Sequence, residues 1–174
     1  MIGASGIWAR DSADRLNIDT SFSCRLIGAR VSLQKWPFNL YAISMYGRFN
    51  EKPQVTRNLH RMISDLHPLL VSHKGRIVLG GDWYADPEYN KRYPYISPLH
   101  KLVFDRLEDR YYGLSRCNRK PIKSFYHSSG YTFQNDYIYA SDPLLQRQVK
   151  CETVNYPKGY WFSDHLPVLA EFRV

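Results

Sequence analysis

The sequence predicts a mixed α/β (α+β) fold in which two β-sheets are flanked by helices. Three observations support this prediction. Residues 23–33 and 167–174 alternate apolar and polar side chains as half-buried strands do. Residues 53–70 carry apolar side chains at the three-, four- and seven-residue spacings of a helix. Strands and helices then follow one another without a regular β-α-β rhythm, which favours stacked sheets with outer helices over a doubly wound sheet.

The first strands are expected between positions 23 and 46. Residues 1–21 show no strong periodicity, although Ile7 and Trp8 could begin a short strand. In the 23–33 segment every second residue is apolar, namely Ile27, Ala29, Val31 and Leu33. Residues 38–46 are almost continuously apolar or aromatic, which predicts a strand buried on both faces.

Two helices and a short strand are expected next. Pro53 stands where a first helical residue tolerates proline. The apolar face of this helix comprises Val55, Leu59, Met62, Ile63, Leu66 and Leu70. Residues 76–82 predict a buried strand that ends in two glycines and a carboxylate. Ser97-Pro98 then supplies an N-cap and a first-turn proline for a second helix. Its apolar residues are Leu99, Leu102, Val103 and Leu107.

The C-terminal third predicts a loop and three strands. Residues 115–123 are basic and rich in turn formers, so we expect an exposed loop there. Strands are expected at 131–133, 136–140 and 167–174, the last because Val168, Ala170 and Phe172 alternate with Leu169, Glu171 and Arg173.

The charge of the chain favours a polyanionic partner. Lys and Arg number 24 against 16 Asp and Glu, which leaves a formal charge of +8. Such a field concentrates nucleic acid, the leading partner class; a charge that serves only solubility is the alternative. No apolar run approaches the ~18 residues of a membrane span, so no membrane association is expected.

The cysteine pattern predicts a reducing, cytoplasmic location. Cys24, Cys117 and Cys151 are odd in number, far apart and never in a C-x-x-C pair. Neither a disulfide framework nor a zinc site is therefore indicated. The N-terminus also lacks the basic start and apolar stretch of a signal peptide.

Three short segments place an acid at the end of an apolar strand. They are Leu79-Gly80-Gly81-Asp82-Trp83, Asn135-Asp136-Tyr137-Ile138 and Ser163-Asp164-His165-Leu166-Pro167-Val168. Strand ends are rigid positions from which a carboxylate can be aimed, and glycine before the acid admits a substrate or a neighbouring backbone. Each acid alone also has a structural explanation: Asp82 as a cap, Asp136 as a surface strand residue, and Asp164 as a turn former.

In this order and spacing, the three segments resemble those of the endonuclease/exonuclease/phosphatase superfamily, which includes deoxyribonuclease I-like enzymes and abasic-site endonucleases. The Ser-Asp-His segment before a C-terminal strand is the most specific of the three. The resemblance starts near Ile7 and covers nearly all that follows. It implies a partial four-layer α/β sandwich, with residues 1–174 as a single domain that corresponds to the C-terminal two thirds of a family domain and lacks its N-terminal strands. It also implies a divalent-metal-dependent phosphodiesterase, most readily an endonuclease or exonuclease acting on nucleic acid.

The resemblance implies a role for each matching residue. Asp82 matches the acid that orients or deprotonates the attacking water, and Asp164 matches a ligand of the metal or of its water. His165 matches the imidazole that contacts the scissile phosphate, and Asp136 matches the carboxylate that fixes its tautomer. Tyr46 matches a phosphate-contacting tyrosine of abasic-site endonucleases. The implied cation is Mg²⁺ or Mn²⁺, because hard cations prefer oxygen ligands.

Two departures from the family pattern predict an impaired enzyme. The family's strands with an Asn and a metal-binding Glu cannot be located in this chain, so the cation is expected to bind weakly. The family also has Asn two positions after the acid matched by Asp82, where this chain has Tyr84, which offers no amide. Three explanations of the missing strands stay open: a partner chain that covers the open sheet edge, adaptation of the fragment, and coding sequence upstream of Met1.

Substrate contacts are expected from Tyr84 and from the basic loop residues Arg116, Arg119 and Lys120. The alternative for the loop is a purely solvated role, and the alternative for the many aromatic residues is packing in the core. We interpret the other histidines as surface or capping residues rather than metal ligands: His60, His67, His73, His100 and His127. Two function classes stay open, a metal-dependent nuclease or related phosphoesterase and a catalytically inactive nucleic-acid- or protein-binding module.

Overall fold

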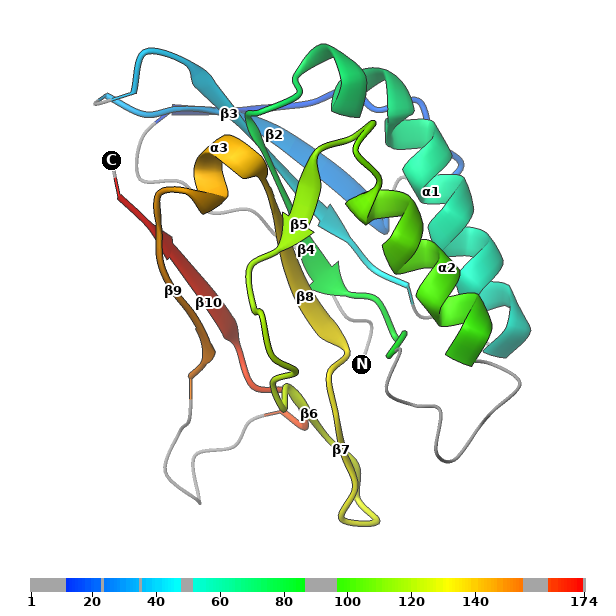
Figure 1. Cartoon of the computed structure of the whole chain (residues 1–174). Helices are drawn as coiled ribbons and strands as arrows, with labels where there is room; N and C mark the ends of the chain where they lie inside the picture. Colours follow the sequence, from blue (N-terminus) through cyan, green and yellow to red (C-terminus); the bar gives the residue numbers. More distant parts are fainter. Residues whose placement is uncertain are drawn as a thin grey trace.

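The computed structural model describes residues 12–22, 24–34, 36–47, 52–86, 97–154 and 163–173. Its strands are β1 (Ser12–Arg15), β2 (Leu26–Ser32), β3 (Asn39–Met45), β4 (Ile77–Asp82), β5 (Leu114–Arg116), β6 (Phe125–Tyr126), β7 (Thr132–Phe133), β8 (Asp136–Ser141), β9 (Gln148–Thr153) and β10 (Val168–Phe172). Its helices are α1 (Lys52–Ser72), α2 (Ser97–Glu108) and α3 (Asp142–Leu145). Figure 1 shows their arrangement.

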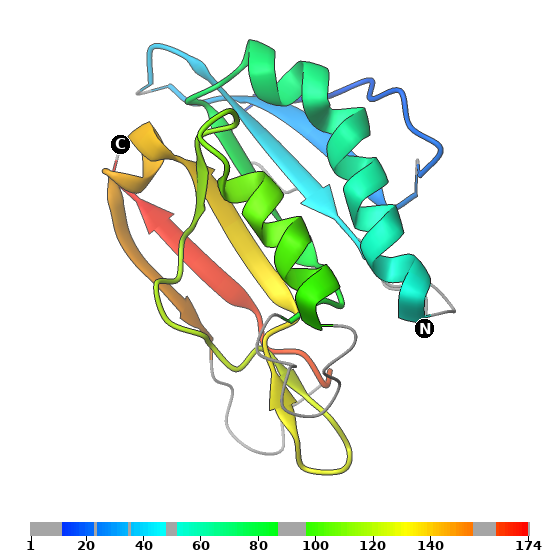
Figure 2. The same ribbon diagram turned by 45° about the vertical axis from the view of Figure 1, so that its right-hand side comes forward.

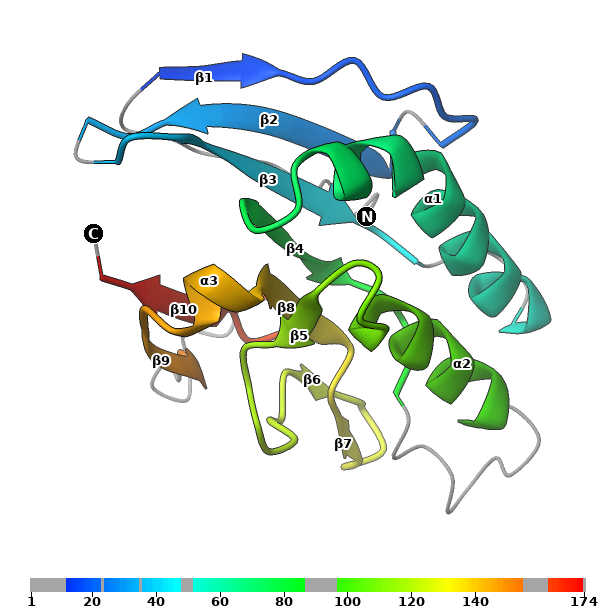
Figure 3. The same ribbon diagram turned by 45° about the horizontal axis from the view of Figure 1, so that its top comes forward.

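A mixed six-stranded sheet forms the centre of the fold, with the strand order β1-β2-β3-β4-β8-β5 (Figure 3). Strands β3 and β4 run parallel because α1 carries the chain back between them, and the other neighbouring pairs are antiparallel. The register of β4 and β8 pairs Asp82 with Asp136. Two of the three predicted acid segments therefore meet at one end of the sheet.

Helices α1 and α2 cover one face of this sheet (Figure 2). The predicted apolar face of α1 is buried, and every one of its six residues is at most 1% exposed. They pack in one core with residues of the sheet such as Ile43, Leu79 and Tyr139. Each such side chain contributes about 1.5–3 kcal/mol on burial, so packing stabilises this helix more than its intrinsic propensity does.

The buried face of α2 differs from the predicted one. Leu99 and Leu102 are 43% and 53% exposed, although helical spacing placed them in the core. The residues that α2 buries are His100, Val103, Phe104 and Leu107. Phe104 faces inward because it packs on Trp83, with the ring centroids 5.7 Å apart. The prediction that His100 is a surface or capping residue was wrong.

The opposite face of the central sheet carries the two-stranded antiparallel sheet β10-β9 (Figure 1). A second apolar cluster lies here around the buried residues Cys117, Ala140 and Leu144. Val78 and Ile138 of the central sheet pack against it, as do Cys151, Ala170 and Phe172 of the hairpin. Helices, a large sheet and a small sheet thus form successive layers, which confirms the predicted mixed fold of sheets flanked by helices.

The basic segment 115–123 is not the exposed loop that its composition predicted. Strand β5 extends to Arg116, and Cys117 and Asn118 are buried. Cys117 is buried because its backbone N–H continues the sheet by donating to Ile138 O at 2.9 Å. Only from Arg119 onward does the segment become exposed, with Arg119, Lys120 and Lys123 all in that class.

Several short elements had no signal in the sequence. Strand β1 is a fully exposed edge strand, and β9 has two consecutive exposed residues, Val149 and Lys150, where alternation would require one. Strand β6 is two residues long and also had no signal. It forms a hairpin with β7, which lies within the strand predicted at 131–133. Ile7 and Trp8, at which a short strand was expected, lie outside the described residues. Within the described ranges, no helix is long and apolar enough to cross a membrane.

Candidate active site

Two carboxylates are presented by neighbouring strand ends. Asp82 closes β4 and Asp136 opens β8, and their backbones are paired in the antiparallel ladder. Residues directly opposite in such a ladder have side chains on the same face, which brings the two carboxylates into one site. Their side chains are 19% and 20% exposed, so both remain accessible from solvent while most of their surface is shielded.

Glycines make the strand end that carries Asp82 possible. Gly81 has φ +133°, and a Cβ there would lie 2.2 Å from Met45 O on β3. A Cβ on Gly47 would lie 2.1 Å from Trp83 O, because Gly47 N–H donates to Asp82 O at 2.8 Å. The β3 and β4 ends therefore approach one another more closely than side chains allow.

The chain turns directly after Asp82 and fixes its carboxylate. The backbone N–H of Tyr84 donates to Asp82 Oδ1 at 3.1 Å. Tyr84 has φ 51°, in the left-handed region that bulky residues rarely adopt. This turn orients the second oxygen, Oδ2, toward His165.

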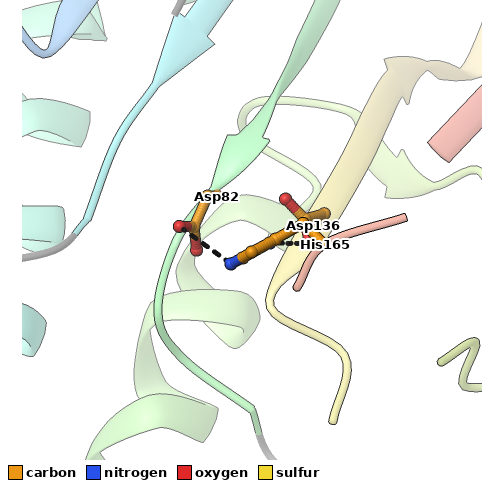
Figure 4. A group of neighbouring side chains, drawn as sticks. All are labelled: Asp82, Asp136 and His165. Atoms are coloured by element: carbon orange, nitrogen blue, oxygen red, sulfur yellow. Dashed lines mark hydrogen bonds and ion pairs between the residues drawn. The ribbon is translucent and has the colours of Figure 1, made fainter. Parts of the chain in front are cut away.

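His165 lies between the two carboxylates, as Figure 4 shows. Its Nδ1 lies 2.8 Å from Asp136 Oδ2, and its Nε2 lies 3.8 Å from Asp82 Oδ2. The Nδ1–H donates to Asp136, which assigns the proton of a neutral ring to Nδ1. The ring is also held from the side by Phe125, with the ring centroids 4.8 Å apart.

The charges around His165 favour its protonated form. Burial acts to lower the pKa of this imidazole, because it removes water from the imidazolium. The hydrogen bond to Asp136 and the negative charges of Asp136, Asp82 and Asp164 act in the other direction and prevail, so the pKa of His165 is raised above its ordinary value of 6.5. These charges thus favour a cationic hydrogen-bond donor next to a carboxylate acceptor.

Ser124 joins the segments that carry Asp136 and His165, and the sequence analysis missed it. Its fully buried Oγ accepts from the backbone N–H groups of Asn135 and Asp136, both at 3.1 Å. Its carbonyl accepts from Leu166 N–H at 2.7 Å, directly after His165. One serine therefore sets the spacing of two site residues that are 29 positions apart. A single Ser after a basic segment carries no local signal for this role.

A buried amide pair supports the same strand from behind. The side chains of Gln134 and Asn118 donate to each other at 3.2 Å and 3.1 Å. Gln134 Nε2 also donates to Asp136 O at 3.3 Å, and its Oε1 accepts from Ile122 N–H at 3.1 Å. The pair connects the end of β8 to the loop with Arg119 and Lys120.

Asp86 and His100 complete this buried network. Asp86 Oδ2 accepts from Gln134 N–H at 3.3 Å, and the backbone of Asp86 contacts His100 Nδ1. Burial lowers the pKa of His100, so a neutral ring is favoured in this position. His100 is a core residue that positions the turn after Trp83.

The structure does not gather the remaining predicted residues as closely. Asp164 is exposed, and its carbonyl accepts from Tyr126 N–H at 2.8 Å. Tyr46 follows β3 at the same end of the sheet, where the Arg25 guanidinium lies 5.9 Å from its ring centroid. Arg116 pairs with Glu108 at 2.8 Å beside α2.

The site offers ligands that fit a divalent cation. One ligand atom each from Asp82, Asp136 and His165 lies within 4.8 Å of the others, and Asp164 is not part of this group. Carboxylate oxygens suit Mg²⁺ or Mn²⁺, but Asp136 Oδ2 already accepts from His165. Asp82 Oδ2 lies 3.8 Å from Nε2, so Asp82 is the carboxylate of this group that is less engaged with the imidazole.

A groove on the hairpin side of the sheet reaches the site. It is lined by polar and apolar residues of β3, β4, β8 and β10, including Ser44, Gly80, Gly81, Asp136 and Val168. Its presence leaves Asp136 accessible from the face opposite α1 and α2.

Several solved structures of other proteins resemble this chain in fold. No protein-family model matches the chain, and no curated protein matches it. An AP endonuclease from Archaeoglobus fulgidus has a TM-score of 0.67 at 21% identity, over 94% of this chain and 71% of that one. The 3′ phosphatase NExo from Neisseria, bound to a product DNA hairpin, has a TM-score of 0.69 at 18% identity, over 87% and 65%. The endonuclease domain of TRAS1, a telomere-specific non-LTR retrotransposon, has a TM-score of 0.62 at 14% identity, over 86% and 64%. The chain thus spans about two thirds of the length of these structures.

Proposed function

From the endonuclease/exonuclease/phosphatase (deoxyribonuclease I-like) fold of this chain, we propose that it is a divalent-metal-dependent phosphodiesterase that hydrolyses nucleic acid. The observation that carries the proposal is the placement of the His165 ring between Asp136 Oδ2 and Asp82 Oδ2, at 2.8 Å and 3.8 Å. A proton acceptor at the end of β4 and a cationic donor beside it are the groups that in-line attack of water on phosphorus requires.

Each side chain has a distinct task in this proposal. Asp82 accepts the proton of the attacking water through Oδ2, while the Tyr84 N–H keeps its other oxygen in place. The imidazolium of His165 donates from Nε2 to a phosphoryl oxygen, and Asp136 holds Nδ1–H so that the ring cannot turn. Tyr46, at the same sheet end, contacts the phosphate from the β3 side.

The cation would be Mg²⁺ or Mn²⁺, and Asp164 is the carboxylate that would hold it, directly or through water. When bound it neutralises charge on the phosphoryl oxygens and so helps the attack on phosphorus. Weak binding is expected, because Mg²⁺ relies on several oxygen ligands in octahedral order. Asp164 directly precedes His165 in the chain and is exposed, so it is the carboxylate proposed for this task.

The substrate is expected to be nucleic acid. The formal charge of +8 attracts a polyanion, and Arg119 and Lys120 are exposed on a loop tied to Asp136 through Gln134. Tyr84 and Arg116 are proposed as further substrate contacts, the latter after release from Glu108. A cytoplasmic location and a single domain over residues 1–174 complete the proposal.

The test is cleavage of supercoiled plasmid and of abasic-site DNA with added Mg²⁺ or Mn²⁺. His165→Ala should lower the rate about 10²- to 10³-fold, the loss expected for one preorganised donor to a developing charge. His127→Ala is the matched control, since His127 is exposed on the β6-β7 hairpin and should leave the rate unchanged. Equal cleavage by wild type and His165→Ala would reject the proposal, as would cleavage that survives removal of metal by EDTA.

A second candidate function is a catalytically inactive module that binds nucleic acid or protein. It is favoured by Tyr84, which stands where the family has an amide and supplies Asp82 with a backbone N–H instead. This candidate predicts DNA affinity that falls steeply with salt and no turnover with either cation. Measured turnover that depends on His165 would exclude it.

A further inference from the structure

The thiols of Cys117 and Cys151 meet where the two sheets pack together. Cys117 directly follows β5, the edge strand of the central sheet, and Cys151 lies in β9 of the hairpin. Both belong to the apolar cluster between the layers, where each thiol shifts the pKa of the other. They are far apart in sequence, so the packing of the hairpin on the sheet brings them together.

The backbone around the two cysteines holds them in register. Cys117 N–H donates to Ile138 O at 2.9 Å, and Gln148 Nε2 donates to Cys117 O at 2.7 Å. Gln148 is the first residue of β9, three positions before Cys151. The edge of the central sheet and the hairpin are thus already tied beside the thiols, which limits the distance that the sulfur atoms can move apart.

We propose that Cys117 and Cys151 form a reversible disulfide that links the central sheet to the β10-β9 hairpin. Disulfide exchange with glutathione disulfide supplies the oxidant. The Cys151 thiolate attacks one sulfur of glutathione disulfide, forms a mixed disulfide and releases one glutathione thiolate. Cys117 then gives up its proton, attacks the Cys151 sulfur and displaces the second glutathione. Two thiols lose two electrons, and one glutathione disulfide becomes two glutathione molecules.

The two thiols differ in exposure and in pKa, as these two steps require. Cys117 is 2% exposed, whereas Cys151 is partly exposed at the edge of the hairpin. The neighbouring Cys117 thiol lowers the pKa of Cys151, because an S–H donor stabilises the thiolate there. The same neighbour and burial raise the pKa of Cys117. Cys151 therefore meets the oxidant first, and Cys117 resolves the mixed disulfide.

A disulfide between Cys117 and Cys151 would affect the candidate active site through strands β9 and β10. Strand β10 follows the segment with Asp164 and His165, and it pairs with β9 so that Cys151 faces Ala170. Fixing β9 to the central sheet therefore fixes the hairpin from which His165 enters the site. The inference does not depend on what reaction the site performs.

The experiment is to equilibrate the purified full chain with glutathione buffers of increasing oxidised fraction and then to block free thiols with N-ethylmaleimide. Trypsin separates the three cysteines into different peptides, because it cuts after Arg15, Arg116 and Lys150. Mass spectrometry should find the Cys117 and Cys151 peptides joined, and dithiothreitol should separate them. Cys24, which is exposed, should carry glutathione or maleimide and serves as an internal control.

Two variants sharpen the test. Cys117→Ser should stop at a mixed disulfide between Cys151 and glutathione, whereas Cys151→Ser should leave the buried Cys117 thiol unmodified. In the wild type the disulfide-linked form should melt about 5–10 °C higher than the reduced form, as expected for a bond that closes the loop between Cys117 and Cys151. Maleimide on both Cys117 and Cys151 at every buffer ratio would overturn the proposal, and so would disulfides found only between Cys24 residues of two chains.

Discussion

The hydrogen bond between Asp136 and His165 should make the stability of the protein depend on pH in a defined way. The perturbation is Asp136→Asn, which removes the charge and keeps the size of the side chain. The backbone N–H of residue 136 can still donate to Ser124 Oγ, so the end of β8 should stay in place. Only the charge next to His165 Nδ1 is lost.

The magnitude follows from the geometry of this bond. A hydrogen bond to a charged partner contributes about 1.5–3 kcal/mol net. The two side chains are 20% and 26% exposed, and Asn can still accept a neutral hydrogen bond, so we expect the lower end of that range. For a chain of this size, about 1.5 kcal/mol corresponds to a fall in Tm of about 3–6 °C.

The sign of the pH dependence follows from the raised pKa of His165. A group with a raised pKa in the folded state contributes stability that is complete below its unfolded value of 6.5 and is lost as pH rises through the folded-state pKa. The Tm difference between wild type and Asp136→Asn should therefore be largest near about pH 6 and shrink toward about pH 9.

The assay is thermal unfolding by circular dichroism across this pH range, with the His165 ring titrated by NMR in both proteins. Asp105→Asn is the matched control, since Asp105 is an exposed carboxylate paired with Lys101 on α2. Other groups titrate equally in both proteins and cancel in the difference. A Tm difference that stays constant with pH, or an unchanged His165 titration in Asp136→Asn, would refute the reasoning.

Three further predictions concern the supports of the site. Gly81→Ala should destabilise the protein by at least about 2 kcal/mol in urea unfolding, because its φ of +133° strains a side chain and its Cβ would meet Met45 O. Gly130→Ala, whose φ is +84° with nothing within 4 Å, is the control and should cost less. Ser124→Ala should cost about 2–4 kcal/mol, since it leaves two backbone N–H groups without their acceptor; a loss equal to that of exposed Ser129→Ala would contradict this role. Tyr84→Asn should raise the plasmid cleavage rate, because Asn supplies an amide and tolerates the left-handed φ of 51°; a lower rate would show that the lost substrate contact of the Tyr84 ring outweighs the added amide.

Local patterns were sufficient for the main elements. The apolar spacing of α1 is a property of residues that are close in sequence. It places all six predicted residues on one face of the helix, and that face is buried against the sheet. The strands β2, β3, β4 and β8 carried the same kind of local signal. The sequence also predicted a close backbone approach at the glycines before Asp82, because only glycine allows the approach of β3 and β4 that the structure shows.

The motifs predicted that Asp82, Asp136 and His165 lie together but not what holds them there. The order of the segments with Asp82, Asp136 and His165 pointed to a common site. Their distances depend on the β4-β8 register and on Ser124, which bonds to both flanking segments. Such bonds join residues that are distant in sequence, and a serine that makes them has the same local surroundings as one that does not.

Tertiary packing also decided which residues are buried where the local pattern was ambiguous. Leu99 and Leu102 follow helical spacing and yet are exposed, because the sheet meets the neighbouring face with His100 and Phe104. Cys117 and Arg116 lie in a basic, loop-like stretch and yet belong to or follow an edge strand, because β8 had an open side to pair with. The sequence by itself determined the elements and their chemistry, since these depend on nearest neighbours along the chain. The structure alone decided the contacts between elements, since these depend on which surfaces pack together.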